Sequence, residues 1–201
     1  AGAAVLVAAT AGSLVTAAGQ RPPEETQGDN VRLALPELTA ALEPDRRYLV
    51  FWQESVVPGS QGYAILNELD RRGFHVGTQP AFHVPATEHR VFQPGTFDAE
   101  IHVVSGGWLD TWAAQHPGVT ELLTVDHRDA AARQRFDELD ARVLVRLAEI
   151  GRSDLADTVD KNLFGASLDP TLPADVVADL AEMILIGEPL TIYLAPAGST
   201  R

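Results

Sequence analysis

The sequence predicts an α/β fold: a three-layer open sandwich with a mainly parallel, Rossmann-like sheet, preceded by an apolar N-terminal helix of the transmembrane type. Apolar runs of strand-forming residues, such as Tyr48–Trp52, alternate along the chain with helical patterns, which is typical of strand–helix–strand units. The run Tyr48–Trp52 is apolar at every position, as in a strand that is buried on both faces. The first segment, Ala1–Gln20, carries no charge.

The composition divides the chain into three segments. Residues 1–20 contain eight Ala and three Gly; they are long enough for a membrane span but weakly hydrophobic, which favours the last helix of a membrane bundle. A signal-peptide remnant and a soluble segment are the alternatives, although no basic region precedes the apolar residues. Residues 21–44 are expected to form a polar stalk and a short helix at 36–42. Residues 45–198 form the α/β domain, and the acidic stalk places it on the extracytoplasmic side of the cell membrane.

Within the domain, strands are predicted from apolar runs that end at Gly, Pro or polar clusters. They are expected at Tyr48–Trp52, Phe74–Val76, Glu100–Val104, Leu122–Val125 and Leu190–Ala195, with short pieces at Phe82–Val84 and His89–Phe92. The runs Tyr48–Trp52 and Ile101–Val104 are expected to be central neighbours because both are apolar on both faces.

Helices are predicted from apolar stripes at helical spacing, with Pro near their starts or Gly at their ends. They are expected at Gln61–Arg72, Trp108–Gln115, Asp129–Glu149, Asp154–Leu163 and Pro173–Ile186.

Composition excludes several classes of function. The net charge of −13 opposes nucleic acid binding. The absence of Cys excludes disulfides and thiolate chemistry. The six His lie between positions 75 and 127, but they form no H-E-x-x-H motif or close ligand pair, so neither a metal nor another cofactor is expected.

Two glycine-bearing loops connect predicted strands to helices and form the candidate binding site. The candidate residues are Glu54, Ser55, Ser60, Gln61, Gly62, Ser105, Gly106, Gly107 and Trp108. In a parallel sheet both loops leave at the same edge, where helix N-termini offer N–H groups to a polar or mildly anionic ligand, and Trp52 and Trp108 would supply an apolar wall. In the alternative interpretation the glycines only allow the chain to turn.

The sequence identifies no catalytic residues. No Ser lies in a G-x-S-x-G motif. Glu54, directly after the first predicted strand, is the best single acid–base candidate, although the interpretation as a solvated loop carboxylate is favoured.

Five stretches resemble the C-terminal extracytoplasmic domains of uncharacterised multi-pass membrane proteins of high-GC bacteria, some of which are GT-C glycosyltransferase-like: Tyr48–Trp52, Gln61–Tyr63, Leu66–Phe74, Asp160–Phe164 and Leu168–Pro170. The resemblance implies a binding, accessory or scaffold module. Its partners would be the membrane bundle of its own full-length chain and a glycan or lipid headgroup. The alternative is the soluble domain of an integral-membrane glycosyltransferase, or a hydrolase acting on cell-envelope glycans. Because the family's catalytic acids lie in membrane loops, catalysis by this domain alone is disfavoured.

Overall fold

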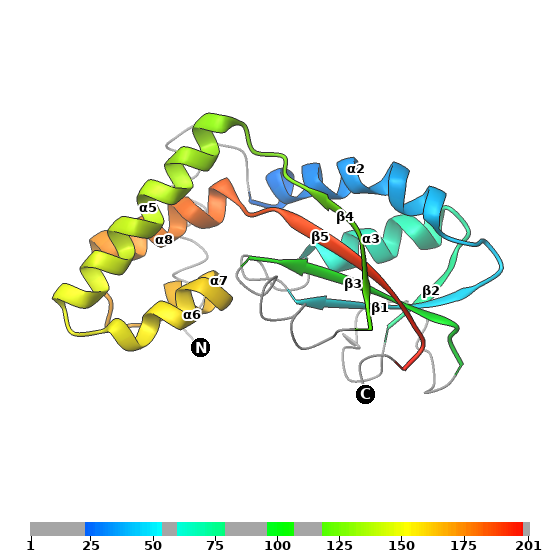
Figure 1. Cartoon of the computed structure of the whole chain (residues 1–201). Coiled ribbons are helices and arrows are strands. Elements are labelled where there is room, and N and C mark those ends of the chain that lie inside the picture. The colour runs from blue at the N-terminus through cyan, green and yellow to red at the C-terminus, as the bar shows by residue number, and fades with distance from the viewer. Residues whose placement is uncertain (1–22, 54–59, 79–95, 107–117, 199–201) are drawn as a thin grey trace.

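The computed structural model describes residues 23–53, 60–78, 96–106 and 118–198. These residues form one five-stranded sheet, two helices that cover one of its faces, and a group of helices beside it (Figure 1). The described part is therefore an α/β structure. The predicted strand pieces at 82–84 and 89–92 and the predicted helix at 108–115 lie outside the described residues.

The sheet is mixed, so the prediction of a mainly parallel, Rossmann-like sheet is wrong. Its strands are β1 (Arg47–Gln53), β2 (His75–Gly77), β3 (Ala99–Ser105), β4 (Thr120–Val125) and β5 (Leu190–Pro196), in the order β2-β1-β3-β5-β4. Strand β1 is parallel to β2 and β3, whereas β5 is antiparallel to both β3 and β4. The error arises because a strand that is apolar on both faces has the same composition in either direction.

The central neighbours were predicted correctly. Strand β1 pairs with β3, with Val50 opposite Ile101, and both strands have partners on each side in the sheet order. Helix α3 (Ser60–Arg71) follows β1 and leads to the parallel strand β2. This strand–helix–strand unit is the part of the fold that matches a Rossmann-like arrangement.

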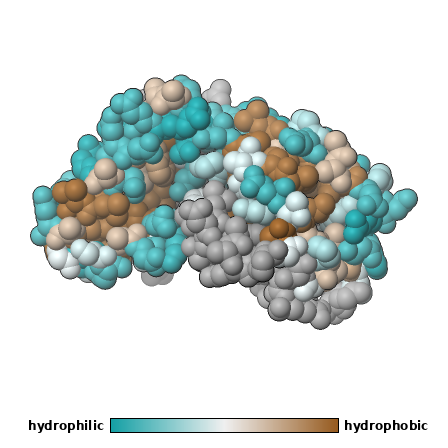
Figure 2. Space-filling model, in the orientation of Figure 1, coloured by the Kyte–Doolittle hydropathy of each residue, from teal (hydrophilic) through white to brown (hydrophobic). Residues whose placement is uncertain are grey.

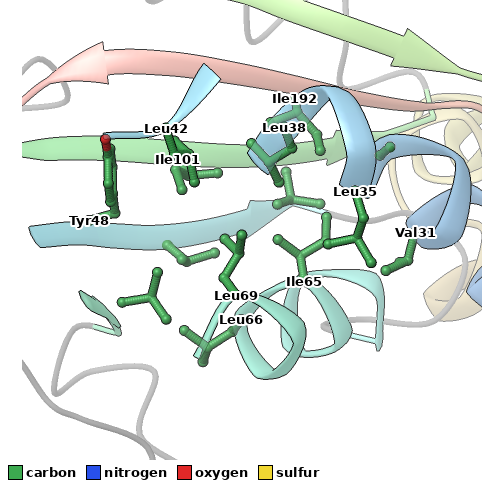
Figure 3. Packing of buried hydrophobic residues seen from close by; sticks show 14 of the residues in the cluster. Val31, Leu35, Leu38, Leu42, Tyr48, Ile65, Leu66, Leu69, Ile101 and Ile192 are labelled. Carbon is green, nitrogen blue, oxygen red and sulfur yellow. The ribbon is translucent and has the colours of Figure 1, made fainter. Parts of the chain in front are cut away.

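Helix α2 (Pro23–Ala41) is longer than the short helix expected at 36–42, and it includes part of the predicted stalk. It packs beside α3 on one sheet face, where Val31, Leu35 and Leu38 contact the apolar core (Figure 3). Pro36 lies within the helix on its exposed side, where water can hydrate the carbonyl group that loses its helical hydrogen bond.

The chain between β4 and β5 forms a helical unit, residues 130–186, beside the sheet (Figure 1). It comprises α5 (Ala130–Glu149), the 3-10 turn η2 (Ser153–Leu155), α6 (Ala156–Lys161), α7 (Leu163–Ser167) and α8 (Ala174–Ile186). Its buried residues form a second apolar cluster that shares no residue with the first. The sequence predicted α5 and α8 well, but the single helix expected at 154–163 is divided among η2, α6 and α7.

A row of ion pairs joins α5 to α8. Arg135 pairs with Glu182, Arg142 with Asp179 and Arg146 with Asp175, at N–O distances of 2.7, 2.6 and 2.9 Å. The three arginines succeed one another along α5 while their partners run in the opposite order along α8. The pairs therefore fix the antiparallel register of the two helices.

The predicted transmembrane-type helix is not supported. Among the described residues, no helix has both the length and the apolar character needed to cross a membrane. The first described helix, α2, instead packs on the sheet. The segment for which the span was predicted, Ala1–Gln20, lies outside the described residues.

Candidate functional site at the carboxyl edge of the sheet

Strands β1, β3 and β4 end at the same edge of the sheet, because β3 and β4 are both antiparallel to the strand between them. Ser105 of β3 and Val125 of β4 both lie opposite Leu190, the first residue of β5. We call this end of the sheet the carboxyl edge. Beyond it lie the two connections to the helical unit, residues 126–129 and 187–189.

The structure describes part of the site predicted from sequence. Glu54, Ser55, Gly107 and Trp108 lie outside the described residues. Ser60 is the first residue of α3, and the next residue, Gln61, is buried. Gly106 turns the chain after β3 with a φ of 74°.

Gly62 has a packing role at this edge. A Cβ atom added to Gly62 would lie 2.6 Å from the Cβ of Trp52, so only glycine allows α3 to approach β1 this closely. Trp52 also contacts the ring of Tyr63, with 4.6 Å between the centroids. These contacts favour a structural role for this glycine over a role in ligand binding.

Ser105 is the predicted residue with the most distinctive environment. Its side chain is fully buried, and its Oγ has no hydrogen-bond partner among the described residues. A buried hydroxyl without a partner costs about 1–3 kcal/mol, and such groups are rare in native proteins. This hydroxyl is therefore a candidate ligand contact.

A second group at the edge was not predicted from sequence. The buried side chain of Asn30 on α2 donates a hydrogen bond from Nδ2 to the Glu188 carbonyl oxygen at 2.8 Å. Its Oδ1 accepts one from the backbone N–H of His127 at 2.9 Å. A single side chain thus holds together both connections to the helical unit.

Arg128 reinforces this junction. Its guanidinium group donates to both carboxylate oxygens of Asp126, at 2.8 and 3.0 Å, and to the Gly187 carbonyl oxygen at 3.2 Å. It also lies 5.3 Å from the centroid of the Phe136 ring. Burial alone would raise the pKa of Asp126, but the hydrogen bonds from Arg128 outweigh burial and lower it. The charges of this pair therefore largely cancel.

Glu188 is buried beside this pair. The pKa of its carboxyl group is raised to about 8, chiefly by burial; the charge of Arg128 acts against this shift, and the charges of Asp160 and Asp140 add to it. Burial likewise lowers the pKa of His127. At neutral pH the edge is therefore lined mainly by neutral hydrogen-bonding groups: a protonated carboxyl, an imidazole, an amide and a hydroxyl.

The sheet face that α2 and α3 do not cover carries a pair of buried polar residues, Glu100 and His102. His102 Nε2 lies 3.0 Å from Glu100 Oε2, and Glu100 Oε1 accepts a hydrogen bond from the Gly198 N–H at 2.7 Å. The His102 ring stacks on Phe51 with 4.8 Å between the centroids. His102 does point away from the helix-covered core, as expected for alternating strand residues, but it is buried. The described residues contain no group of three or more side chains that could hold a metal ion.

Asn30, His127 and Glu188 escaped sequence analysis because they come from distant segments and form no motif. One signal was present: Glu188 is the only charged residue in the apolar stretch Met183–Leu194. A lone acid in such a run is either exposed or buried with a raised pKa.

Comparison of the chain with protein-family models, curated proteins and solved structures finds no match. The resemblance to glycosyltransferase-like membrane proteins therefore stays a prediction.

Proposed function

We propose that this protein is a binding module that holds a neutral, hydroxyl-rich ligand, such as a segment of a glycan, at the carboxyl edge of the sheet. The observation that carries the proposal is the Ser105 hydroxyl, which is fully buried and has no hydrogen-bond partner among the described residues. A ligand hydroxyl would satisfy it. Because Ser105 is inaccessible in this structure, the edge must open for binding, which lowers the apparent affinity.

The chemistry of the edge favours a neutral ligand over an anion. Arg128, the cation at the junction, is already paired with Asp126, and the whole chain carries a net charge of −13. The remaining groups donate and accept hydrogen bonds without a full charge. His127 and Arg128 are partly exposed and would contact the ligand first.

A titration with soluble oligosaccharides tests the proposal. Amide chemical shifts of the full chain would be followed with a panel of neutral oligosaccharides, with glycerol phosphate as a probe for a lipid headgroup. We expect shifts around Ser105, His127 and Glu188 with the neutral sugars.

A matched pair of serine variants sharpens this test. Ser105→Ala should weaken binding by about tenfold, as expected for loss of one hydrogen bond from a buried site. The same variant should not lower the thermal stability of the unliganded protein, because no hydrogen bond to a described residue is lost. Ser153→Ala, at an exposed position in the helical unit, should change neither quantity. Shifts confined to surfaces away from the edge would contradict the proposal, and the absence of any shift would favour a scaffold role.

Glu188 favours a second candidate function, hydrolysis of a glycan. A buried carboxyl that stays protonated near neutral pH is the form a general acid requires, and Asp140 and Asp160 are close enough to influence it. Product analysis on the same oligosaccharides distinguishes the two functions. Glu188→Gln should abolish turnover if the protein is a hydrolase and should leave binding measurable in either case.

The location at the cell membrane on the extracytoplasmic side, with the membrane bundle of the full-length chain as partner, remains a prediction from sequence. Fractionation of cells that express the full-length protein, followed by protease treatment of intact cells, would test it.

A further inference from the structure

One side of the helical unit carries apolar side chains that are flanked by acids. On α5, Asp137, Asp140 and Leu144 are three, four and seven residues apart and therefore share one face of the helix. This face lies beside the buried stripe of Leu139, Val143 and Leu147 and away from the arginines that pair with α8. We call the surface formed by this face and by α6 and α7 the acidic strip.

The apolar part of the acidic strip is exposed. Leu144 is 38% exposed, and on α7 Phe164 is 37% and Leu168 is 45% exposed. The buried stripe of α5 shares one apolar cluster with Val159 of α6 and Leu163 of α7, so the exposed side of α5 beside this stripe borders α6 and α7. Figure 2 shows an apolar band on this unit between α5 and the α6–α7 segment, with hydrophilic surface along its sides.

Acids of the strip on α5 lie near an acid on α6. Burial raises the pKa of Asp140, and the charges of Asp160 on α6 and Asp137 on α5 raise it further. The cations nearby already have partners: Lys161 pairs with Asp157 on α6 itself, and Arg135 pairs with Glu182 on α8. The strip therefore combines apolar surface with an excess of negative charge.

We propose that the acidic strip is a docking surface for a cationic amphipathic helix of a partner protein. The apolar face of such a helix would cover Leu144 and Phe164, and its Lys or Arg side chains would pair with Asp137, Asp140 and Asp160. The net charge of −13 would also steer a cationic partner toward the protein. The same charge opposes a second copy of this chain or an anionic membrane as the occupant.

A synthetic peptide tests the docking surface directly. The probe is a Leu/Lys amphipathic peptide of about 18 residues, which gives about five helical turns, and a scrambled peptide of equal composition is its control. Binding to the full chain would be measured by calorimetry at low and high salt. We expect the amphipathic peptide to bind and to gain helicity, and the scrambled peptide to bind at least tenfold more weakly.

Two matched pairs of variants locate the binding site. Leu144→Ser should weaken peptide binding by about tenfold, whereas Val145→Ser, the next residue, should not, because Val145 is 58% exposed and does not lie on the Asp137–Leu144 face of α5. Asp137→Asn combined with Asp160→Asn should weaken binding and flatten its salt dependence. Asp45→Asn, at an exposed position before β1, should do neither. Thermal melts would confirm that each variant is folded.

Equal effects of Leu144→Ser and Val145→Ser would overturn the proposal, as would equal binding of the two peptides. Sedimentation of the free protein tests whether a second copy of the chain occupies the strip instead. If the protein dimerises and Leu144→Ser abolishes the dimer, the strip is a contact between two copies and the partner-helix proposal is wrong.

Discussion

Glu188 links the sheet to the helical unit at the level of a single residue. Its carbonyl oxygen accepts a hydrogen bond from Asn30, while its carboxyl group is buried near Arg128. The pKa of this carboxyl rises from 4.5 to about 8 on folding. Between those two values the folded protein binds more protons than the unfolded chain, so the free energy of unfolding falls as the pH rises through this window.

Glu188→Gln should therefore stabilise the protein at pH 8 and have little effect near pH 5. The stabilisation relative to the wild type should be larger at pH 8 than at pH 5, by an amount on the order of a few kcal/mol. The reason is that the amide has no deprotonated form that must be buried. Urea denaturation at both pH values would measure it.

Glu37→Gln provides the matched control, since Glu37 lies on the exposed side of α2 and its substitution should leave the pH dependence unchanged. A stability difference between Glu188→Gln and the wild type that does not vary with pH would contradict the assigned burial.

At this scale the sequence predicted candidates but not their arrangement. Ser105 and Gln61 were named as candidates because a Gly-bearing loop after a buried strand is a local signal. Asn30 was missed because its role depends on a contact with His127, 97 residues away, and no local pattern records such a contact. Gly62 was predicted as a binding residue, and its close approach to Trp52 only became evident from the packing.

At the scale of elements, composition identified most strands and the long helices, because burial on both faces and helical stripes are local properties. The direction of β5 was not predictable in this way. It depends on the helices of residues 130–186, which return the chain so that β5 enters between β3 and β4. The start of α2 was also missed, because Pro22–Glu25 has the composition of a linker.

The ion pairs between α5 and α8 should contribute modestly to stability. A double-mutant cycle with Arg142→Gln and Asp179→Asn should give a small favourable coupling energy, since Arg142 is half-exposed and the Asp179 side chain is only 16% exposed. Roughly half of it should be lost in about 1 M NaCl. The same cycle on the more exposed Arg46–Glu43 pair should give a smaller value, and a coupling of zero at low salt for Arg142 and Asp179 would show that the pair contributes nothing.

At the scale of the whole molecule, two apolar cores are joined at one junction. The sheet core and the helical core share no residue, and the chain passes between them only at residues 126–129 and 187–189 within its described part. Asn30 and Arg128 hold these two connections together. Such an arrangement favours partial opening of one unit while the other stays folded.

Hydrogen exchange should reveal this partial opening. Amides of α5 and α8 should exchange at a lower free energy than those of β1 and β3. Asn30→Ala leaves the His127 N–H and the Glu188 carbonyl without their partner, so we expect a loss of about 2–4 kcal/mol, greater for the helical unit than for the sheet. Asn67→Ala, at an exposed position on α3, should have little effect on either unit. Exchange of both units at one common free energy would show that the molecule unfolds as a whole.

The position of β5 has a consequence for synthesis on the ribosome. This strand follows the other described strands along the chain, yet it lies between β3 and β4 in the finished sheet. Until it emerges, β4 has no neighbour among the described strands, and one edge of β3 offers its unpaired N–H and C=O groups to any other extended chain. The nascent protein therefore carries this exposed edge while the residues between β3 and β5 are translated, and chaperones that shield extended segments should associate with it until β5 is complete.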